Sequence, residues 1–114
     1  MNVKKEFISH LEKIQKNNKE VISAIIALKR FLDTDLKIVL NPNYNESEYN
    51  NFLKALNVKY DDGFGMQELY GYIWYNDGTW SERYEYDGSE YWVYKKCPSF
   101  QDKFIINMPS EEDN

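Results

Sequence analysis

Residues 71–96, which read GYIWYNDGTWSERYEYDGSEYWVYKK, decide the predicted fold of the chain. Asp77-Gly78 and Asp87-Gly88 are strong turn signals, and each is flanked by aromatic residues that favour strands. Strands at about 68–75, 79–86 and 89–96 would then be joined by tight loops. The pattern predicts an antiparallel β-meander.

The two turns also predict how these strands pair. Asn76 to Gly78 fits a three-residue loop with its glycine in the left-handed conformation, and Asp87-Gly88 fits a two-residue type I′ turn. Counting outward from these turns gives the expected cross-strand neighbours. They are Trp74 with Trp80, Arg83 with Trp92, Tyr84 with Tyr91, and Glu85 with Glu90.

An apolar stripe with helical spacing runs through the first 32 residues. Its members, at alternating steps of four and three, are Phe7, Leu11, Ile14, Asn18, Val21, Ile25, Leu28 and Leu32. The stripe predicts one helix over residues 3–32, and its seam would suit a homodimer with Asn18 at a core position. The alternative is a helical hairpin that breaks at Asn17 and Asn18, with Asn17 and Glu20 as a capping box.

A short strand and a further helix are predicted before the meander. Residues 36–41, LKIVLN, alternate and end at a proline, and Asn45 with Glu48 forms a capping box for a helix ending near Asn57. The predicted fold class is therefore α+β, in one domain over residues 1–114. Its parts are a helical region (1–35), a strand and helix (36–57), a three- to four-stranded meander region with an apolar segment at 104–106 (58–107), and an acidic tail (108–114).

Composition predicts a folded protein of a reducing compartment. Hydrophobic residues make up 42% of the 114 positions, which is enough apolar surface for a packed core. Cys97 is the only cysteine, and the sequence begins without the apolar core of a secretory signal, so we expect a cytoplasmic protein. Abundant Lys, Asn, Ile and Tyr indicate an AT-rich genome, such as that of a low-GC bacterium or its phages.

The net charge of −5 is unevenly distributed along the chain. Residues 1–40 carry eight Lys and Arg against five Asp and Glu, which gives +3, and residues 41–114 carry six against fourteen, which gives −8. A negative field disfavours nucleic acid and favours a protein partner with a basic surface, although it also serves solubility. The longest apolar run, residues 24–28, is too short to enter a membrane as a span.

Neither a catalytic nor a metal centre is recognisable in the sequence. His10 is the single histidine, and a catalytic triad needs partners that the sequence does not show. Cys97 has no identifiable base, and one histidine with one cysteine cannot complete a four-ligand zinc site. We therefore expect no enzyme activity, no cofactor and no metal, unless the fold brings His10 or Cys97 into a cleft with a carboxylate.

Aromatic and acidic residues of the meander form the predicted partner-binding site. Aromatics fall on both faces of the predicted sheet, and one helical layer covers only one face, so several should remain exposed as interaction residues rather than as mere strand formers. The opposed Glu85 and Glu90 repel each other, which calls for a compensating cation or a binding role. The predicted contact residues are Trp80, Glu82, Glu85, Tyr86, Asp87, Glu90, Tyr91 and Trp92. Alternatively, the exposed aromatics would stack a carbohydrate or another small ligand.

Residues 69–98, LYGYIWYNDGTWSERYEYDGSEYWVYKKCP, resemble a hairpin module of small phage proteins. In that module a DG-[ST]-W turn is followed by a YDGSE-[YW]-W strand and a proline. In size, acidity and composition the chain is also similar to phage anti-CRISPR and other anti-defence inhibitors. This resemblance implies a non-enzymatic inhibitor in a bacterial host, which docks an acidic aromatic sheet on a basic surface of a nuclease complex.

Overall fold

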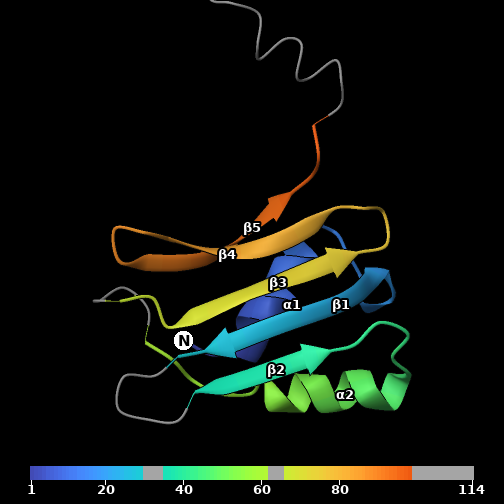
Figure 1. The fold of residues 1–114 in the computed structure, drawn as a ribbon, viewed down its shortest axis with the longest axis horizontal. Coiled ribbons are helices and arrows are strands. Elements are labelled where there is room, and N and C mark those ends of the chain that lie inside the picture. The colour runs from blue at the N-terminus through green and yellow to red at the C-terminus, as the bar shows by residue number, and fades with distance from the viewer. Residues whose placement is uncertain (30–34, 62–65, 99–114) are drawn as a thin grey trace, which may run out of the picture.

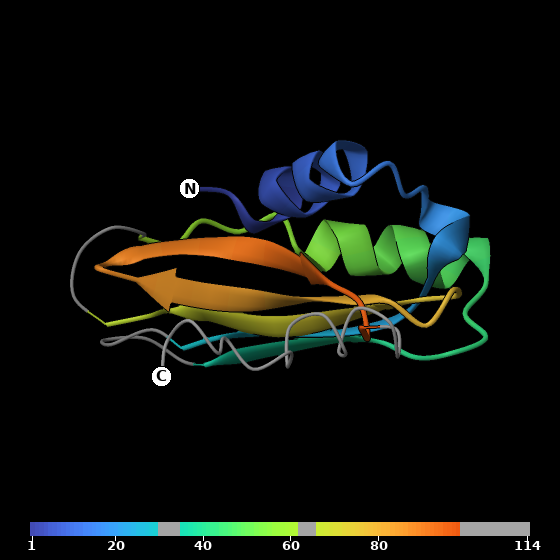
Figure 2. The ribbon, with the colours of Figure 1, turned by 90° about the horizontal axis from the view of Figure 1, so that it is seen from above.

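A computed structural model describes residues 1–29, 35–61 and 66–98, which form two layers. The helices α1 (Val3–Lys13) and α2 (Glu46–Ala55) lie on one face of a five-stranded sheet (Figures 1 and 2). None of the described elements lies over the opposite face, which we call the open face. Of the helices in the described part of the chain, none has the length and apolar character needed to cross a membrane.

The sheet is antiparallel throughout, in the order β2-β1-β3-β4-β5. The interior strand β1 (Val21–Leu28) pairs with β2 (Leu36–Leu40) and β3 (Leu69–Tyr75), and β4 (Trp80–Tyr86) and β5 (Ser89–Lys95) continue the sheet. The predicted α+β class with an antiparallel meander is confirmed. The sheet has five strands because β1 and β2 join the meander.

The predicted helix over residues 3–32 is wrong beyond Lys13. The chain leaves the helix at Gln15, where φ is 61°, and residues Asn18–Glu20 form a single 3₁₀ turn, η1. The helical hairpin is therefore wrong as well, although the Asn17 capping box that suggested it is present. Without one long helix, the seam that supported a homodimer does not exist.

Residues 21–28, VISAIIAL, form an interior strand of the sheet instead of a helix. Ala24, Ile26 and Leu28 are buried beneath the helices, whereas Ile25 at the alternate position is exposed on the open face. β-Branched side chains lose rotamer freedom in a helix and pack well on a pleated sheet, which favours the strand here.

The predicted strand at 36–41 and the helix that follows are confirmed as β2 and α2. The Asn45 side chain accepts a hydrogen bond from the Glu48 amide at 2.7 Å, and the Glu48 carboxylate accepts one from the Asn45 amide at 2.9 Å. This capping box satisfies two of the amides that the first turn of a helix leaves free. The helix then buries Tyr49 and Phe52 against the sheet.

Both predicted hairpins are also confirmed. Asp87 and Gly88 have φ values of 54° and 87°, as a type I′ turn requires, and Gly78 has a φ of 84°. All four predicted cross-strand pairs occur, namely Trp74 with Trp80, Arg83 with Trp92, Tyr84 with Tyr91 and Glu85 with Glu90. Alternation along each strand consequently decides which side chains face the helices and which face the open side.

A single hydrophobic core joins the helices to the sheet. The rings of Phe7 in α1 and Phe52 in α2 meet edge to face with centroids 5.5 Å apart, and Leu69 and Ile73 of β3 are fully buried in the same core. Burying a side chain of this size contributes about 1.5–3 kcal/mol. The apolar segment predicted at 104–106 and the acidic tail at 108–114 lie outside the described residues.

Candidate functional site

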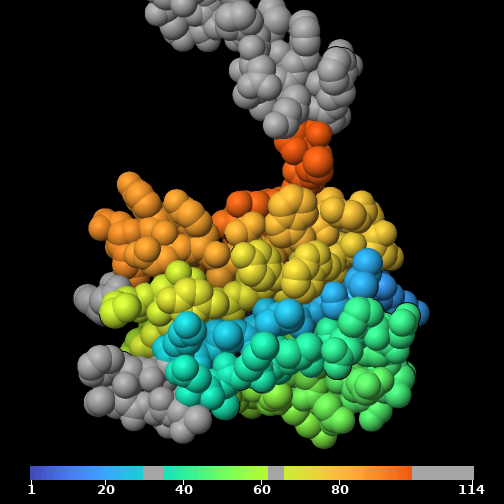
Figure 3. All heavy atoms as spheres, in the orientation of Figure 1, coloured from blue at the N-terminus to red at the C-terminus, as the bar shows by residue number. Residues whose placement is uncertain are grey.

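Aromatic side chains gather on the open face of the sheet. Buried residues such as Leu69 and Ile73 alternate along β3 with aromatics that point to the other side, and β4 and β5 repeat the pattern. Figure 3 shows this face, with the strands side by side and neither helix in front of β1, β3 or β4. The seven residues of this open-face aromatic surface are Tyr70, Tyr72, Trp74, Trp80, Tyr84, Tyr86 and Tyr91.

Exposure of these side chains is high for their size. Tyr72 is 46% exposed, Tyr84 is 49% exposed and Tyr86 is 67% exposed. Antiparallel sheets that face water on one side normally carry polar residues there. This face instead continues its apolar character onto β1 and β2, where Ile25 pairs with Val39 and both are exposed.

Contacts between neighbouring rings hold the aromatic surface in place. Tyr84 and Tyr91 meet edge to face with centroids 5.7 Å apart, and Tyr72 stacks on Trp74 at the same distance. Such pairs contribute about 0.5–1.5 kcal/mol beyond the area that they bury. A partner would therefore meet a surface that is largely preorganised.

Charge is sparse on the open face, although the ammonium of Lys29 lies 5.5 Å from the centroid of the Tyr70 ring. Glu82 lies 3.2 Å from Lys95 and also accepts a hydrogen bond from the indole Nε1 of Trp80 at 3.0 Å. The hydrogen bond from Trp80 is the largest cause that lowers the pKa of Glu82, and Lys95 adds to it. The remaining charged side chain at an open-face position of the five strands is Lys37 in β2. The centre of the surface is consequently almost neutral.

The eight predicted contact residues fall on different parts of the molecule. Trp80, Glu82, Tyr86 and Tyr91 lie on the open face, and Asp87 lies in the turn that joins β4 to β5. Glu85, Glu90 and Trp92 occupy the alternate positions and face the helices. Glu90 is 5% exposed and Trp92 is 8% exposed, so the expectation that these two lie at an accessible surface is wrong.

The opposition of Glu85 and Glu90 is resolved within the fold. Glu85 accepts a hydrogen bond from the Gly88 amide at 2.8 Å, within the turn. Glu90 accepts from the amides of Leu69 at 2.9 Å and Glu68 at 2.8 Å. The compensating cation expected for the opposed glutamates is Arg83, whose Nη2 lies 3.7 Å from Glu90.

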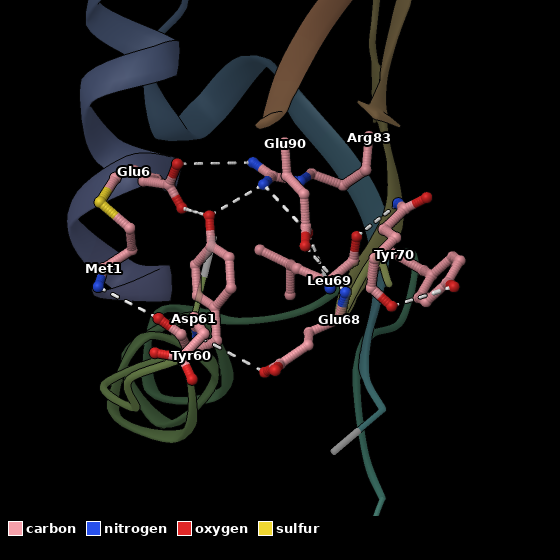
Figure 4. Close-up of polar contacts among 10 residues, drawn as sticks. Met1, Glu6, Tyr60, Asp61, Glu68, Leu69, Tyr70, Arg83 and Glu90 are labelled. Carbon is pink, nitrogen blue, oxygen red and sulfur yellow. Dashed lines mark hydrogen bonds and ion pairs between the residues drawn. The ribbon is translucent and has the colours of Figure 1, made fainter. Parts of the chain in front are cut away.

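Arg83 is the centre of a buried polar cluster beneath α1 (Figure 4). Its guanidinium donates to the hydroxyl of Tyr60 at 2.9 Å and lies 3.7 Å from Glu6, while Tyr60 also donates to Glu6. Burial is the main cause that raises the pKa of Tyr60, and the hydrogen bond to Glu6 adds to it. The cluster joins α1, β4 and β5, because Glu6, Arg83 and Glu90 come from different elements.

His10 takes part in a second buried polar contact. Its Nε2 lies 2.7 Å from Oγ of Ser81, which is also 2.7 Å from the hydroxyl of Tyr75. Burial, followed by the charges of Lys13 and Arg83, lowers the pKa of His10 to about 4, so the ring is neutral at neutral pH. Ser81 is 0% exposed, and these contacts satisfy polar groups inside the core.

The structure does bring His10 and a carboxylate to one groove, which is lined by both His10 and Glu6. Glu6 is already engaged by Tyr60 and Arg83, and the partner of His10 is the enclosed Ser81. Cys97 is exposed and does not line this groove. Within residues 1–29, 35–61 and 66–98, no three His, Cys, Asp or Glu side chains are grouped closely enough to hold a metal ion.

Comparison with known proteins adds no relative to this picture. No family model matches the sequence, and no curated protein and no solved structure matches it significantly. The residues of the open face therefore have to be judged by their geometry alone. The contact residues predicted from the sequence did not include Tyr72, Tyr84 or Ile25, although Tyr84 shares its strand parity with Trp80 and Tyr86.

Proposed function

We propose that the protein is a non-enzymatic interaction protein that binds another protein through the open-face aromatic surface. The observation that supports the proposal is the collection of seven Tyr and Trp side chains on an uncovered sheet face whose central carboxylate, Glu82, is already paired. Tyrosine and tryptophan dominate the energetic centres of protein interfaces. Exposed apolar surface of this kind marks interaction sites rather than ordinary solvated faces.

Charge defines the chemistry of the partner. A charged group docked against the centre of this face would lose its hydration without gaining a counter-ion, because Glu82 and Lys95 neutralise each other. The partner surface is therefore apolar and uncharged at its centre. This differs from the acidic docking surface expected from the sequence, where Glu85 and Glu90 were to steer a basic partner.

A narrower form of the proposal is a phage-encoded anti-CRISPR or anti-defence inhibitor that acts on a host nuclease complex. That form is supported only by the resemblance of residues 69–98 to small phage proteins and by the character of the sequence. Acidic side chains at the tip of the β4–β5 hairpin, Glu85 and Asp87, would then lie at the rim of the interface and not at its centre.

Capture of a partner, followed by measurement with purified proteins, tests the proposal. The wild type, a Tyr72→Thr/Tyr86→Thr variant and a Tyr94→Thr variant would be immobilised and exposed to lysate of a low-GC bacterium, the source that the composition indicates. Tyr94 is the control because it is an exposed tyrosine whose strand position faces the helix side. Each captured protein would then be purified and titrated calorimetrically.

We expect the open-face variant to bind at least about tenfold more weakly and the Tyr94→Thr variant to bind as the wild type does, since anchoring tyrosines carry most of the binding energy. We also expect little dependence on salt, because few unpaired charges meet at the centre. A partner that binds both variants alike, or a steep salt dependence that Glu85→Gln removes, would contradict docking through this face.

A further inference from the structure

The outer edge of β5 is free to pair with another strand among the described elements. β5 is the last strand in the sheet order, and no described strand pairs with its outer side. In a two-residue hairpin the residues flanking the turn exchange hydrogen bonds, so Ser89 and every second residue after it bond to β4. The backbone groups of Glu90, Trp92 and Tyr94 therefore point away from the sheet. Long edges of this kind accept added strands.

A groove runs beside this edge, between β5 and α1. Its volume is about 410 Å³, and its walls include Lys5, Ser9, His10 and Lys13 of α1 with Tyr91 and Trp92 of β5. Lys5, Ser9 and Lys13 follow one another at steps of four along one side of the helix. The helix therefore supplies a ridge of amines and a hydroxyl that borders the edge strand.

Charge in the groove is positive. Lys5 and Lys13 make no ion pair with any described residue, and the carboxylate of Glu6 in the same groove is engaged by Tyr60 and Arg83. The pKa of His10 reflects this field: after burial, the charges of Lys13 and Arg83 are the causes that lower it. A ligand that carries carboxylates would complement the two free amines.

The groove has a buried hydrogen-bond donor without an acceptor. Nε1 of Trp92, a residue that lines the groove, is buried and has no hydrogen-bond partner among the described residues. The far end of the Trp92 ring reaches across β4 to Gly71, which leaves the Nε1 end nearer β5. An unpaired buried donor of this kind favours a ligand that brings an acceptor.

We propose that the edge of β5 and the groove beside it bind an extended acidic segment of a partner protein. The segment pairs with Glu90, Trp92 and Tyr94 as a sixth strand, and its alternate side chains enter the groove, where carboxylates meet Lys5 and Lys13. A peptide fits better than another anion because only a backbone satisfies the outward amides and carbonyls of β5. This surface is separate from the open face, and its test does not depend on the function proposed above.

Selection from a random peptide library provides the test. The purified protein would be panned against peptides of about nine residues, a length that covers one strand. Enriched peptides would be synthesised and titrated against wild type, a Lys5→Glu/Lys13→Glu variant and a Lys19→Glu/Lys54→Glu variant. Lys19 and Lys54 are exposed residues outside the groove, so the second variant controls for the change in net charge.

We expect enriched peptides to carry Asp or Glu at alternate positions. Their affinity should fall at least about tenfold in the Lys5→Glu/Lys13→Glu variant and stay within about twofold of the wild type in the control. Amide exchange, followed by NMR, should slow at Glu90, Trp92 and Tyr94 when the peptide is bound. The Tyr72→Thr/Tyr86→Thr variant should bind the peptide as the wild type does, which separates this site from the open face.

Three outcomes of the binding experiments would overturn the proposal. They are a library without enriched peptides, enriched peptides without acidic residues, and equal weakening in the two charge-reversal variants. Protection of amides elsewhere than on β5 would also place the peptide outside this groove and refute the strand pairing.

Discussion

Glu85 and Glu90 face each other across the β4–β5 hairpin, yet their carboxylates are bound by different groups. Glu85 accepts a hydrogen bond from the Gly88 amide within its own turn. Glu90 is buried, pairs with Arg83, and accepts hydrogen bonds from the amide of Glu68, just before β3, and from that of Leu69, the first residue of β3. Glu90 thus fixes the hairpin to the rest of the sheet, and Glu85 stabilises the turn. The role of the pair in the structure is stability.

Removal of the Arg83 charge should strongly destabilise the fold. In Arg83→Met the carboxylates of Glu6 and Glu90 remain buried without their cation, and breaking a buried pair costs about 3–5 kcal/mol. Lys95→Met is the control, because it removes the exposed cation beside Glu82. The free energy of unfolding should decrease by less than about 1 kcal/mol in this variant. Urea denaturation at neutral pH measures both. Equal decreases in the free energy of unfolding for the two variants would show that the buried ion pairs stabilise the fold no more than the exposed one does.

Titration of His10 should make the protein less stable in mild acid. Its pKa falls from 6.5 to about 4 on folding, so between these values the unfolded chain binds a proton that the folded chain does not. The free energy of unfolding therefore decreases as the pH falls, and the full loss, on the order of 3 kcal/mol, is reached below pH 4. Above pH 6.5 this contribution is complete.

A His10→Gln variant isolates that effect from the titration of carboxylates. Glutamine keeps a polar group near Ser81 but does not titrate, so the difference in unfolding free energy between wild type and variant should shrink as the pH falls through this window. Urea denaturation at a series of pH values provides the measurement. Parallel curves for the two proteins would mean that His10 is not held neutral by the fold.

Gly71 should not tolerate a side chain. A Cβ at this position would lie 2.8 Å from the carbonyl oxygen of Ile25 and 3.1 Å from Cη2 of Trp92. Since the first of these is backbone, Gly71→Ala must shift β1 against β3, and overpacking of this kind costs about 1–3 kcal/mol. Gly78→Asn is the control, because the site has open space and asparagine tolerates its positive φ. A smaller melting-temperature decrease in Gly71→Ala than in the control would contradict the close packing.

Local signals explain what the sequence predicted correctly. Asp87-Gly88 supplies both positive φ values of a type I′ turn, so the turn sets the register of β4 and β5 without help from the rest of the fold. The Asn45 capping box likewise places the start of α2 to the residue. The register shows which side chains share a face of the sheet, but it does not show which face the helices cover. Trp92 and Glu90 were therefore wrongly assigned to the accessible surface.

Tertiary packing decided what the sequence left undetermined. Val21, Ile25 and Leu28 continue the helical stripe of α1, but the same segment buries Ala24, Ile26 and Leu28 at steps of two once it lies between β2 and β3. Periodicity cannot separate these two arrangements in a short apolar run. The run of β-branched residues was the available signal, and no glycine or proline marks the end of α1 at Gln15.

Loss of aromatic rings from the open face should leave the fold nearly intact. A Tyr72→Thr/Tyr84→Thr/Tyr86→Thr variant keeps good strand formers and loses only contacts between exposed rings, so we expect a decrease in unfolding free energy of about 1–2 kcal/mol. Ile73→Thr, fully buried on the other face of β3, is the contrasting variant and should lose about 2–4 kcal/mol from one substitution. Urea denaturation compares them, and static light scattering reports self-association. If three exposed tyrosines contribute more to stability than Ile73 does, their conformation is needed for folding and the aromatic surface has a structural explanation that requires no partner.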